Sequence, residues 1–322
     1  MKIFVTRKIP REGIELLLKN GFEVEVFEKK EPISREELLN GAKGADGLIC
    51  LLTDKIDKEI MEKTGIKVIA NYAVGYDNID IQAATELRIP VTNTPGVLTD
   101  ATADLTWALI LAVSRRIVEA DKFVREQRFK GWEPMLFLGG DFKNKTIGII
   151  GMGRIGKAVA RRAAGFGMNI IYFNRTRKKD VEDELNARFV SLDTLLKESD
   201  YISIHCPYTP ETHHLIDWEE FELMKHSCYL VNTARGKVVN EKALIKALQD
   251  KRIMGAGLDV FYNEPEVPKE FYSLPNVVLL PHIGSASIET RNKMAVMAAE
   301  NIIECLKGNI PPNIINKEIY EK

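Results

Sequence analysis

The chain has 322 residues, and its 45 Lys and Arg against 46 Asp and Glu give a net charge of −1. This length allows two domains with buried cores, and the balanced charge excludes a general electrostatic attraction to nucleic acid or to an anionic membrane surface. A site for an anion must therefore be a local arrangement of donors.

Short apolar runs alternate with amphipathic stretches in the first hundred residues. Five runs are typical of strands: "KIFVT", "FEVEVFE", "DGLICLL", "KVIANY" and "IPVTN". The stretches between them are typical of helices, and one of these begins with Ser34 and Glu37 at capping-box spacing. Strands that alternate with helices predict a parallel sheet covered by helices.

The periodic stretch from Ala101 to Arg128 predicts one long helix, capped by Thr99 or Asp100. A second strand–helix series follows from Thr146, and its six strands are "TIGIIG", "NIIYF", "YISIHC", "CYLVNTA", "GAGLDVF" and "NVVLL". A terminal helix that ends near Gly308 is expected to cross back to the first domain. We therefore predict an α/β fold with two doubly wound parallel-sheet domains and a cleft between them. One domain is formed by 1–98 plus 286–322 and the other by 99–285.

Compartment and metal content can also be predicted from the sequence. The four cysteines (Cys50, Cys206, Cys228 and Cys305) include no CxxC pair, which favours reduced thiols over disulfides or a metal site. The N-terminus lacks the unbroken apolar core of a signal peptide, and no run approaches the roughly 18 apolar residues that span a bilayer. We expect a soluble cytoplasmic protein without a bound metal.

Gly151, Gly153 and Gly156 form a G-x-G-x-x-G motif between a strand and a helix. The first glycine permits a tight turn, the second allows the backbone to approach a pyrophosphate, and the third allows close packing of the helix on the strand. A glycine-rich turn alone is weak support for a ligand. With a strand before it and a second strand at the right distance, the motif predicts dinucleotide binding.

The second strand of this unit ends at Asn174, where a dinucleotide site normally carries an acid for the ribose hydroxyls. Without that carboxylate, nothing repels a 2′-phosphate, and Arg175, Thr176 and Arg177 can donate to one. The segment "NRTRKK" is otherwise an ordinary solvated basic turn. We expect NADP(H) to be preferred, with NAD(H) possible.

Three late strands end in residues that suit reduction of a 2-oxo acid: Arg235, Glu264 and His282. A cation binds the substrate carboxylate and polarises its carbonyl, and an acid with a pKa near neutrality protonates the oxygen. A carboxylate beside the histidine orients the ring and keeps it protonated. Each residue alone has an ordinary structural interpretation, but together at successive strand ends they favour an active site.

Other polar residues are weaker candidates. His205 also follows a strand and competes with His282, whereas His213, His214 and His226 are expected on the surface. In the first domain, the amides of Val74 and Gly75 follow a strand and can bind a carboxylate, although an ordinary turn is equally consistent with this segment.

Several long motifs resemble the D-2-hydroxyacid dehydrogenase family, and specifically its glyoxylate/hydroxypyruvate reductase branch. They cover essentially the whole chain: "VGYDNID", "VTNTPGVLTDATADLTWALIL", "GIIGMGRIGKAVARRA", "LVNTARGKVVNEKAL", "GAGLDVFYNEPE" and "LPHIGSA". The resemblance implies a Rossmann cofactor domain inserted in a flavodoxin-like substrate domain. It also implies a homodimer formed through the cofactor domains, including the long helix after Thr99 and the loop that follows it.

The resemblance implies a role for each matching residue. Arg235 would bind substrate, Glu264 would pair with the histidine, and His282 would donate the proton. Cofactor contacts would come from Met152, Gly153, Arg154 and Ile155 at the pyrophosphate, from Asn174, Arg175 and Thr176 at the adenosine ribose, and from Thr233, Ala234, Asp259, His282 and Gly284 at the nicotinamide half.

One position departs from the family pattern. Leu136 stands where some glyoxylate reductases have a tryptophan that reaches the neighbouring subunit's active site. This substitution leaves the choice among glyoxylate, hydroxypyruvate and larger 2-oxo acids open. A D-lactate or 2-ketogluconate dehydrogenase is the alternative enzyme, and a dinucleotide-sensing co-repressor is the alternative outside catalysis. The chain leaves no room after its last helix for a regulatory domain, which makes a phosphorylated substrate less favoured.

Overall fold

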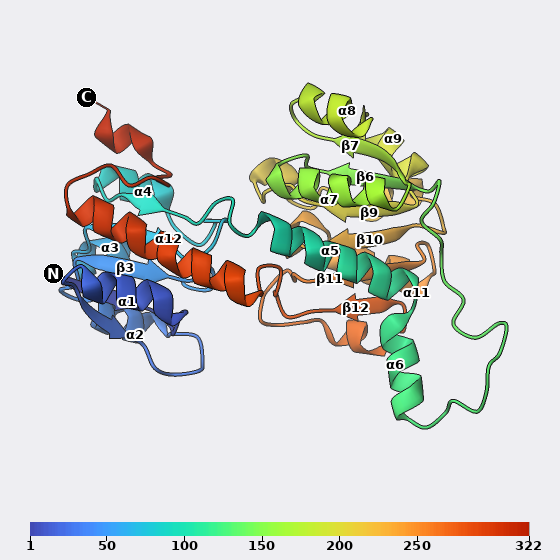
Figure 1. Cartoon of the computed structure of the whole chain (residues 1–322), viewed down its shortest axis with the longest axis horizontal. Helices are drawn as coiled ribbons and strands as arrows, with labels where there is room; N and C mark the ends of the chain where they lie inside the picture. Colours follow the sequence, from blue (N-terminus) through green and yellow to red (C-terminus); the bar gives the residue numbers. More distant parts are fainter. Residues whose placement is uncertain (322) are drawn as a thin grey trace. The chain divides into compact units, whose positions relative to one another are not determined.

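The computed structural model describes residues 1–321 and divides the chain into two compact units. The first consists of Met1–Leu98 and Ser285–Lys322, and the second of Thr99–Gly284. Ser285 thus belongs to the first unit, one residue from the boundary expected from the sequence. Each unit is built around its own parallel sheet (Figure 1).

The first unit has a five-stranded parallel sheet in the order β2-β1-β3-β4-β5, which is the flavodoxin-like order. Its strands are β1 (Lys2–Val5), β2 (Glu23–Val26), β3 (Gly47–Cys50), β4 (Val68–Asn71) and β5 (Val91–Thr92). Its helices are α1 (Arg11–Lys19), α2 (Arg35–Ala42), α3 (Lys58–Thr64), α4 (Ile81–Glu86), α12 (Ile288–Leu306) and the 3-10 helix η4 (Lys317–Tyr320). The capping box of Ser34 and Glu37 is present, and α12 packs against α1, β3 and β4, as expected for a helix that returns to this unit.

The second unit has a seven-stranded parallel sheet in the order β12-β11-β10-β9-β6-β7-β8. Its strands are β6 (Thr146–Ile150), β7 (Asn169–Phe173), β8 (Arg188–Phe189), β9 (Tyr201–Ile204), β10 (Tyr229–Asn232), β11 (Gly255–Leu258) and β12 (Val277–Leu279). The sequence predicted six strands and missed β8. Its two residues are both exposed, so they carry no apolar run that would signal a strand.

Helices cover both faces of this sheet. They are α5 (Thr99–Ser114), α6 (Ile117–Arg125), α7 (Arg154–Gly165), α8 (Lys179–Leu185), α9 (Leu192–Glu198), α10 (Trp218–Leu223) and α11 (Glu241–Gln249), with 3-10 helices η1 (Pro210–Thr212), η2 (Gly236–Val238) and η3 (Lys269–Ser273). Helices α5 and α7 lie in front of the sheet in Figure 1 and bury one apolar core, while α9, α10 and α11 bury another. Side chains buried from both faces explain why these strands are continuous apolar runs.

The long helix predicted over 101–128 is in fact two helices, because the helical conformation is interrupted between Ser114 and Ile117. Arg116 has a left-handed backbone conformation, with φ of +53°. The carbonyl of Ser114 accepts a hydrogen bond from the amide of Gly140 (3.1 Å) instead of continuing the helix. A side chain at Gly139 would collide with that same carbonyl at 2.3 Å, so the two glycines bring a distant loop onto the helix end.

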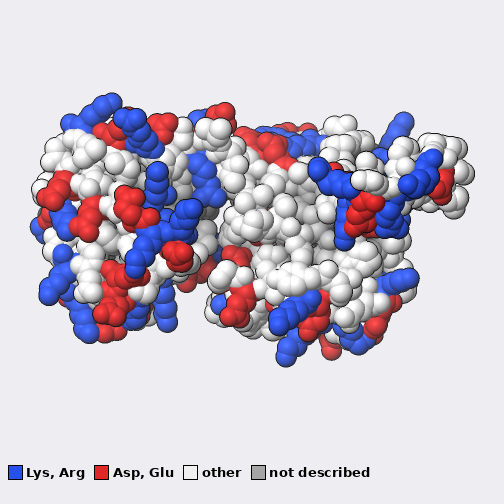
Figure 2. Space-filling view, turned by 90° about the horizontal axis from the view of Figure 1, so that it is seen from below, with Lys and Arg blue, Asp and Glu red and all other residues white. Residues whose placement is uncertain are grey.

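All four cysteines are free, and Cys50 and Cys228 are buried. No helix within residues 1–321 is long and apolar enough to cross a membrane, and no cluster of three or more potential metal ligands occurs within that range. Charged side chains of both signs are interspersed on the faces visible in Figure 2, and an uncharged area extends over the second unit.

Candidate active site

The three glycines of the turn after β6 occupy three different environments. Gly151 has φ of +97°, and a Cβ there would lie 2.5 Å from the Cys206 nitrogen. A Cβ on Gly156 would lie 2.2 Å from the Gly151 carbonyl oxygen, so only glycine lets α7 pack this closely. At Gly153 a Cβ would meet nothing within 4 Å. The turn is therefore closely packed at Gly151 and Gly156 and open at Gly153, the N-cap of α7. This arrangement fits a pyrophosphate.

Asn174 connects this turn to the loop after β7. Its Oδ1 accepts a hydrogen bond from the Met152 amide (3.2 Å), and its Nδ2 donates to the Thr176 carbonyl (2.7 Å). The residue that replaces the usual acid thus holds the turn after β6 and the loop after β7 in one conformation. Arg175 and Thr176 are exposed beside it.

The sequence predicted that Arg177 can donate to a 2′-phosphate, but in the structure its guanidinium already pairs with a carboxylate. It makes a two-pronged contact with Glu182 of α8, with Nε at 2.9 Å from Oε1 and Nη2 at 2.7 Å from Oε2. Glu182 also accepts from the buried Tyr172 hydroxyl (2.7 Å), and that hydroxyl accepts from the Lys178 amide (2.7 Å). The guanidinium of Arg177 holds the pKa of Glu182 down to about 2. Of the two arginines, Arg175 is the one that these contacts leave available for a phosphate.

The carboxyl ends of β10, β11 and β12 bring Arg235, Glu264 and His282 to one edge of the sheet, because these three strands are adjacent and parallel. The His282 Nδ1 lies 2.7 Å from the Glu264 Oε2, while the Glu264 Oε1 accepts from the Phe261 amide (2.9 Å). Burial alone would raise the pKa of Glu264, but the hydrogen bond and charge of His282 lower it overall. This contact uses Nδ1, so Nε2 is the ring nitrogen that can exchange a proton with a ligand.

Asp259 fixes the backbone beside His282. Its two carboxylate oxygens accept from the amides of Ile283 and Gly284, each at 2.7 Å. The side chain is fully buried, and burial raises its pKa. His282 itself has φ of +55°, a conformation that is costly for a histidine. We infer that the two hydrogen bonds to Asp259 offset that cost and set the direction of the ring.

The loop of Arg235 is held by its own strand. Asn232, the last residue of β10, donates to the Arg235 carbonyl (2.9 Å) and accepts from the Ala234 amide (3.0 Å). The Arg235 Nη1 donates to the Ala234 carbonyl (2.8 Å). Thr233 is buried and shares a hydrogen bond with Thr106 of α5 (2.9 Å). The 232–235 turn therefore has a defined conformation at the sheet edge.

His205 does not suit an acid at neutral pH. Its Nε2 lies 2.7 Å from the Ser203 hydroxyl, and burial lowers the pKa of the ring to about 3, so the ring is neutral near pH 7. His213 and His226 are exposed and His214 is partly exposed. Among the candidate histidines, His282 is the one that contacts a carboxylate.

In the first unit, side-chain amides hold the segment after β4. Asn93 donates to the Val74 carbonyl and Asn71 donates to the Gly75 carbonyl, both at 2.7 Å. The first bond fixes the peptide unit that carries the Gly75 N–H. The unit that carries the Val74 N–H is held separately, because the Ala73 carbonyl accepts from the Thr94 amide (2.9 Å). Asn71 also exchanges a hydrogen bond with Asn78, which completes a polar turn at the carboxyl edge of this sheet.

Sequence reasoning missed several residues that support the site: Tyr172, Glu182, Thr106, Asn232 and Glu241. A polar residue at the end of an apolar strand was an available signal for Asn232. Nothing in a single sequence pairs the others with their partners, since those partners depend on how loops fold onto helices.

Known proteins similar to this chain agree with the geometry. Residues 107–284 match the model for the D-isomer specific 2-hydroxyacid dehydrogenase NAD binding domain. The chain is 54% identical to a glyoxylate reductase of Thermococcus litoralis, with 99% of this chain and 97% of the relative covered. It is 53% identical to a glyoxylate reductase of Pyrococcus horikoshii, with the same coverage of 99% and 97%.

Two solved structures extend the comparison. A Thermus thermophilus protein has a TM-score of 0.93 and 48% identity, covering 98% of this chain and 100% of that one. An NADPH-dependent glyoxylate/hydroxypyruvate reductase of Sinorhizobium meliloti, in complex with NADP and malonate, has a TM-score of 0.85 and 32% identity, covering 98% and 96%. The chain belongs to the D-isomer specific 2-hydroxyacid dehydrogenase family.

Proposed function

We propose that this protein reduces glyoxylate to glycolate and hydroxypyruvate to D-glycerate, using a nicotinamide dinucleotide. The observation that carries the proposal is the hydrogen-bonded pair of His282 and Glu264, which shares a sheet edge with Arg235 and with the Gly151 turn. The similarity to glyoxylate reductases over nearly the whole chain supports this substrate class over other 2-oxo acids.

Each residue of the set has a distinct role in this reaction. A bound reduced nicotinamide would supply the hydride that reduces the carbonyl carbon. Arg235 binds the substrate carboxylate and polarises the carbonyl, and His282 gives the proton on Nε2 to the carbonyl oxygen. Glu264 orients the ring through Nδ1 and stabilises its positive charge before transfer.

The remaining contacts carry over as part of the same proposal. The amides of Val74 and Gly75 bind the substrate carboxylate. Cofactor contacts are assigned to Gly151, Met152, Gly153, Arg154, Ile155 and Gly156 at the pyrophosphate, to Asn174, Arg175 and Thr176 at the adenosine ribose, and to Thr233, Ala234, Asp259, His282 and Gly284 at the nicotinamide half.

We propose that NADP(H) is the preferred cofactor. Asn174 presents no charge to repel a 2′-phosphate, and the exposed Arg175 can donate to one. The pairing of Arg177 with Glu182 makes this preference weaker than two available arginines would give. NAD(H) therefore remains a usable cofactor.

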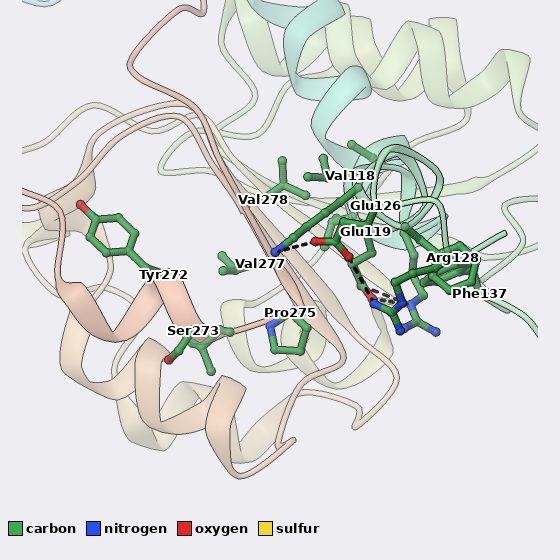
Figure 3. Close-up of a pocket in the computed structure, with 16 residues that line it drawn as sticks. Val118, Glu119, Glu126, Arg128, Phe137, Tyr272, Ser273, Pro275, Val277 and Val278 are labelled. Carbon is green, nitrogen blue, oxygen red and sulfur yellow. Dashed lines mark hydrogen bonds and ion pairs between the residues drawn. The ribbon is translucent and has the colours of Figure 1, made fainter.

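We propose a homodimer formed through the second unit. Helix α6 and the segment 126–145 after it carry large exposed apolar side chains, including Trp132 (84% exposed) and Met135 (75%). The segment is anchored where Phe137 packs edge-on against Phe123 of α6, with ring centroids 5.3 Å apart. The adjoining groove has a volume of about 640 Å³. Residues of α6 line one side of it and Tyr272 to Val278 line the other (Figure 3). An apolar surface of this kind is typical of a subunit contact.

The test is a set of initial rates with glyoxylate, hydroxypyruvate and pyruvate, each with NADPH and with NADH. Faster turnover of either of the first two substrates with NADPH is expected. A preference for pyruvate or a larger 2-oxo acid would favour a D-lactate or 2-ketogluconate dehydrogenase instead, and would show what Leu136 does to substrate choice. Tight cofactor binding without turnover of any 2-oxo acid would indicate a dinucleotide-sensing protein.

A further inference from the structure

The peptide that joins Phe261 to Tyr262 lies between the loops of two proposed catalytic residues. On one side, the Phe261 amide donates to the Glu264 carboxylate (2.9 Å). On the other side is Gly236, directly after Arg235, where a Cβ would fall 2.0 Å from the Phe261 carbonyl carbon and 2.5 Å from the Tyr262 nitrogen. Only a glycine allows these two loops to be so close, so a shift of this peptide would move Glu264 and the Arg235 loop together.

Glu241 holds this peptide from a third direction. It is the first residue of α11, where a negative charge is stabilised by the helix dipole, and its Oε1 accepts from the Tyr262 amide (2.9 Å). The side chain is partly buried and does not cap its own helix, because Asn240 does that. A charged carboxylate in a partly buried position costs desolvation free energy. A neutral side chain could accept the same hydrogen bond without that cost.

We propose that Glu241 is a positioning residue for the proposed reduction. It places the Phe261–Tyr262 peptide, and through that peptide the carboxylate that orients His282. Its negative charge also increases the proton affinity of the Glu264–His282 pair. This inference rests on the proposed function for its kinetic consequence, but its electrostatic part concerns the free protein.

The charges around the pair set the sign of the effect. Burial and the Glu264 charge raise the pKa of Glu241, so the two carboxylates interact. The other charged or titratable groups near this cluster are Asp259 at the end of β11, Arg235 before η2, Lys237 over the Tyr262 ring, and His213 and His214 against the same ring. Removing one negative charge from this group makes the pair release its proton at lower pH.

Two substitutions separate the charge of Glu241 from its hydrogen bond. Glu241→Gln keeps an acceptor of the same shape and removes the charge, whereas Glu241→Ala removes both. Glu219→Gln is the matched control, because Glu219 is an exposed acid in the first turn of α10 in the same unit. The readouts are kcat, KM and the pH dependence of kcat with glyoxylate and NADPH. A further readout is the titration of ¹³C-labelled histidine in the cofactor-free protein, with the His282 signal assigned from His282→Ala.

With Glu241→Gln, we expect kcat near neutral pH within about threefold of wild type. The alkaline limb of the pH profile and the His282 titration should both move to lower pH, because a nearby negative charge is removed. With Glu241→Ala, kcat should fall at least about tenfold while KM for NADPH changes little. Glu219→Gln should match wild type in every measurement.

An unmoved His282 titration in Glu241→Gln, or an unchanged kcat in Glu241→Ala, would overturn the inference. The inference would also be overturned if Glu241→Ala lost activity in step with thermal unfolding while Glu241→Gln left the pH profile and the His282 titration unchanged. Failure of the proposed function looks different, because wild type itself would then reduce no 2-oxo acid. The histidine titration would still decide the role of Glu241 in that case.

Discussion

At the scale of single residues, two carboxylates determine how His282 is presented. Glu264 fixes the ring through Nδ1, and Asp259 fixes the backbone through the next two amides. Asp259 uses both of its oxygens on the amides after His282, whereas Glu264 uses one oxygen on the His282 ring and the other on the Phe261 amide. These contacts leave few alternative conformations for the histidine loop. Such support is what a proton donor requires, since a displacement of about 1 Å can cost a hundredfold in rate.

His282→Ala should lower turnover of glyoxylate by at least a hundredfold, because the proposed proton donor is lost. The dissociation constant for NADPH should stay within a few-fold of wild type, because the glycine turn and the Asn174 loop are unchanged. Steady-state rates and a fluorescence titration with NADPH measure the two quantities. His226→Ala, at an exposed position, is the control, and near-normal turnover of His282→Ala would refute the assignment.

His205 should make the second unit less stable in acid. The folded protein keeps this ring neutral down to a pKa of about 3, whereas the unfolded chain binds a proton below its ordinary 6.5. The stability contribution is therefore complete above pH 6.5 and declines as pH falls from 6.5 towards 3, by about 1.4 kcal/mol per pH unit.

The measurement is urea unfolding of wild type and His205→Gln at pH 7 and pH 5. The free energy of unfolding of wild type, relative to the variant, should fall by roughly 2 kcal/mol between these pH values. The exposed His226→Gln, measured in the same way, is the control for the loss of a histidine at the protein surface. A difference between wild type and His205→Gln that is equal at both pH values would mean that the ring is protonated in the folded state.

At the scale of elements, the loop between β7 and α8 should control cofactor choice through one ion pair. Glu182→Gln removes the charge that holds Arg177, so that arginine can then reach a 2′-phosphate. We expect the kcat/KM ratio of NADPH over NADH to rise a few-fold in Glu182→Gln and to fall about tenfold in Arg175→Ala, since a charged hydrogen bond is worth roughly 1.5 kcal/mol.

Glu184→Gln is the control for the loop, because Glu184 lies on the same helix and pairs with Lys157 and Arg161 instead. It should leave the cofactor ratio unchanged. If Arg175→Ala also leaves the ratio unchanged, the basic segment is a solvated turn and NADP(H) preference does not come from it.

The elements also show what a single sequence can and cannot predict. Apolar runs predicted the long buried strands, and the order of strand ends predicted that Glu264 and His282 share an edge, because adjacent parallel strands end together. The two-residue β8 has no such run. The break after Ser114 depends on Gly139 and Gly140, whose docking on the helix is a tertiary contact. The pairing of Arg177 with Glu182 likewise depends on where α8 begins.

At the scale of the whole molecule, balanced charge and a concentrated apolar surface favour self-association. The net charge of −1 provides little repulsion between copies. Most of the large exposed apolar side chains of the second unit lie on α6 and 126–145. In the adjoining groove, Arg116 pairs with Glu119, while Lys122 and Arg128 both pair with Glu126. Each of these charged groups already has a partner of opposite sign, which lowers the cost of burying this surface in a dimer.

Trp132→Glu should therefore dissociate the proposed dimer, because it puts a charge at the most exposed of these apolar side chains. Sedimentation velocity should give twice the 36.4 kDa chain mass for wild type and the single-chain mass for the variant. Ile310→Glu is the control, since Ile310 is 62% exposed but belongs to the first unit, and it should remain a dimer. A single-chain mass for wild type would exclude the dimer. If the dimer persists in Trp132→Glu and dissociates in Ile310→Glu, the interface lies in the first unit instead.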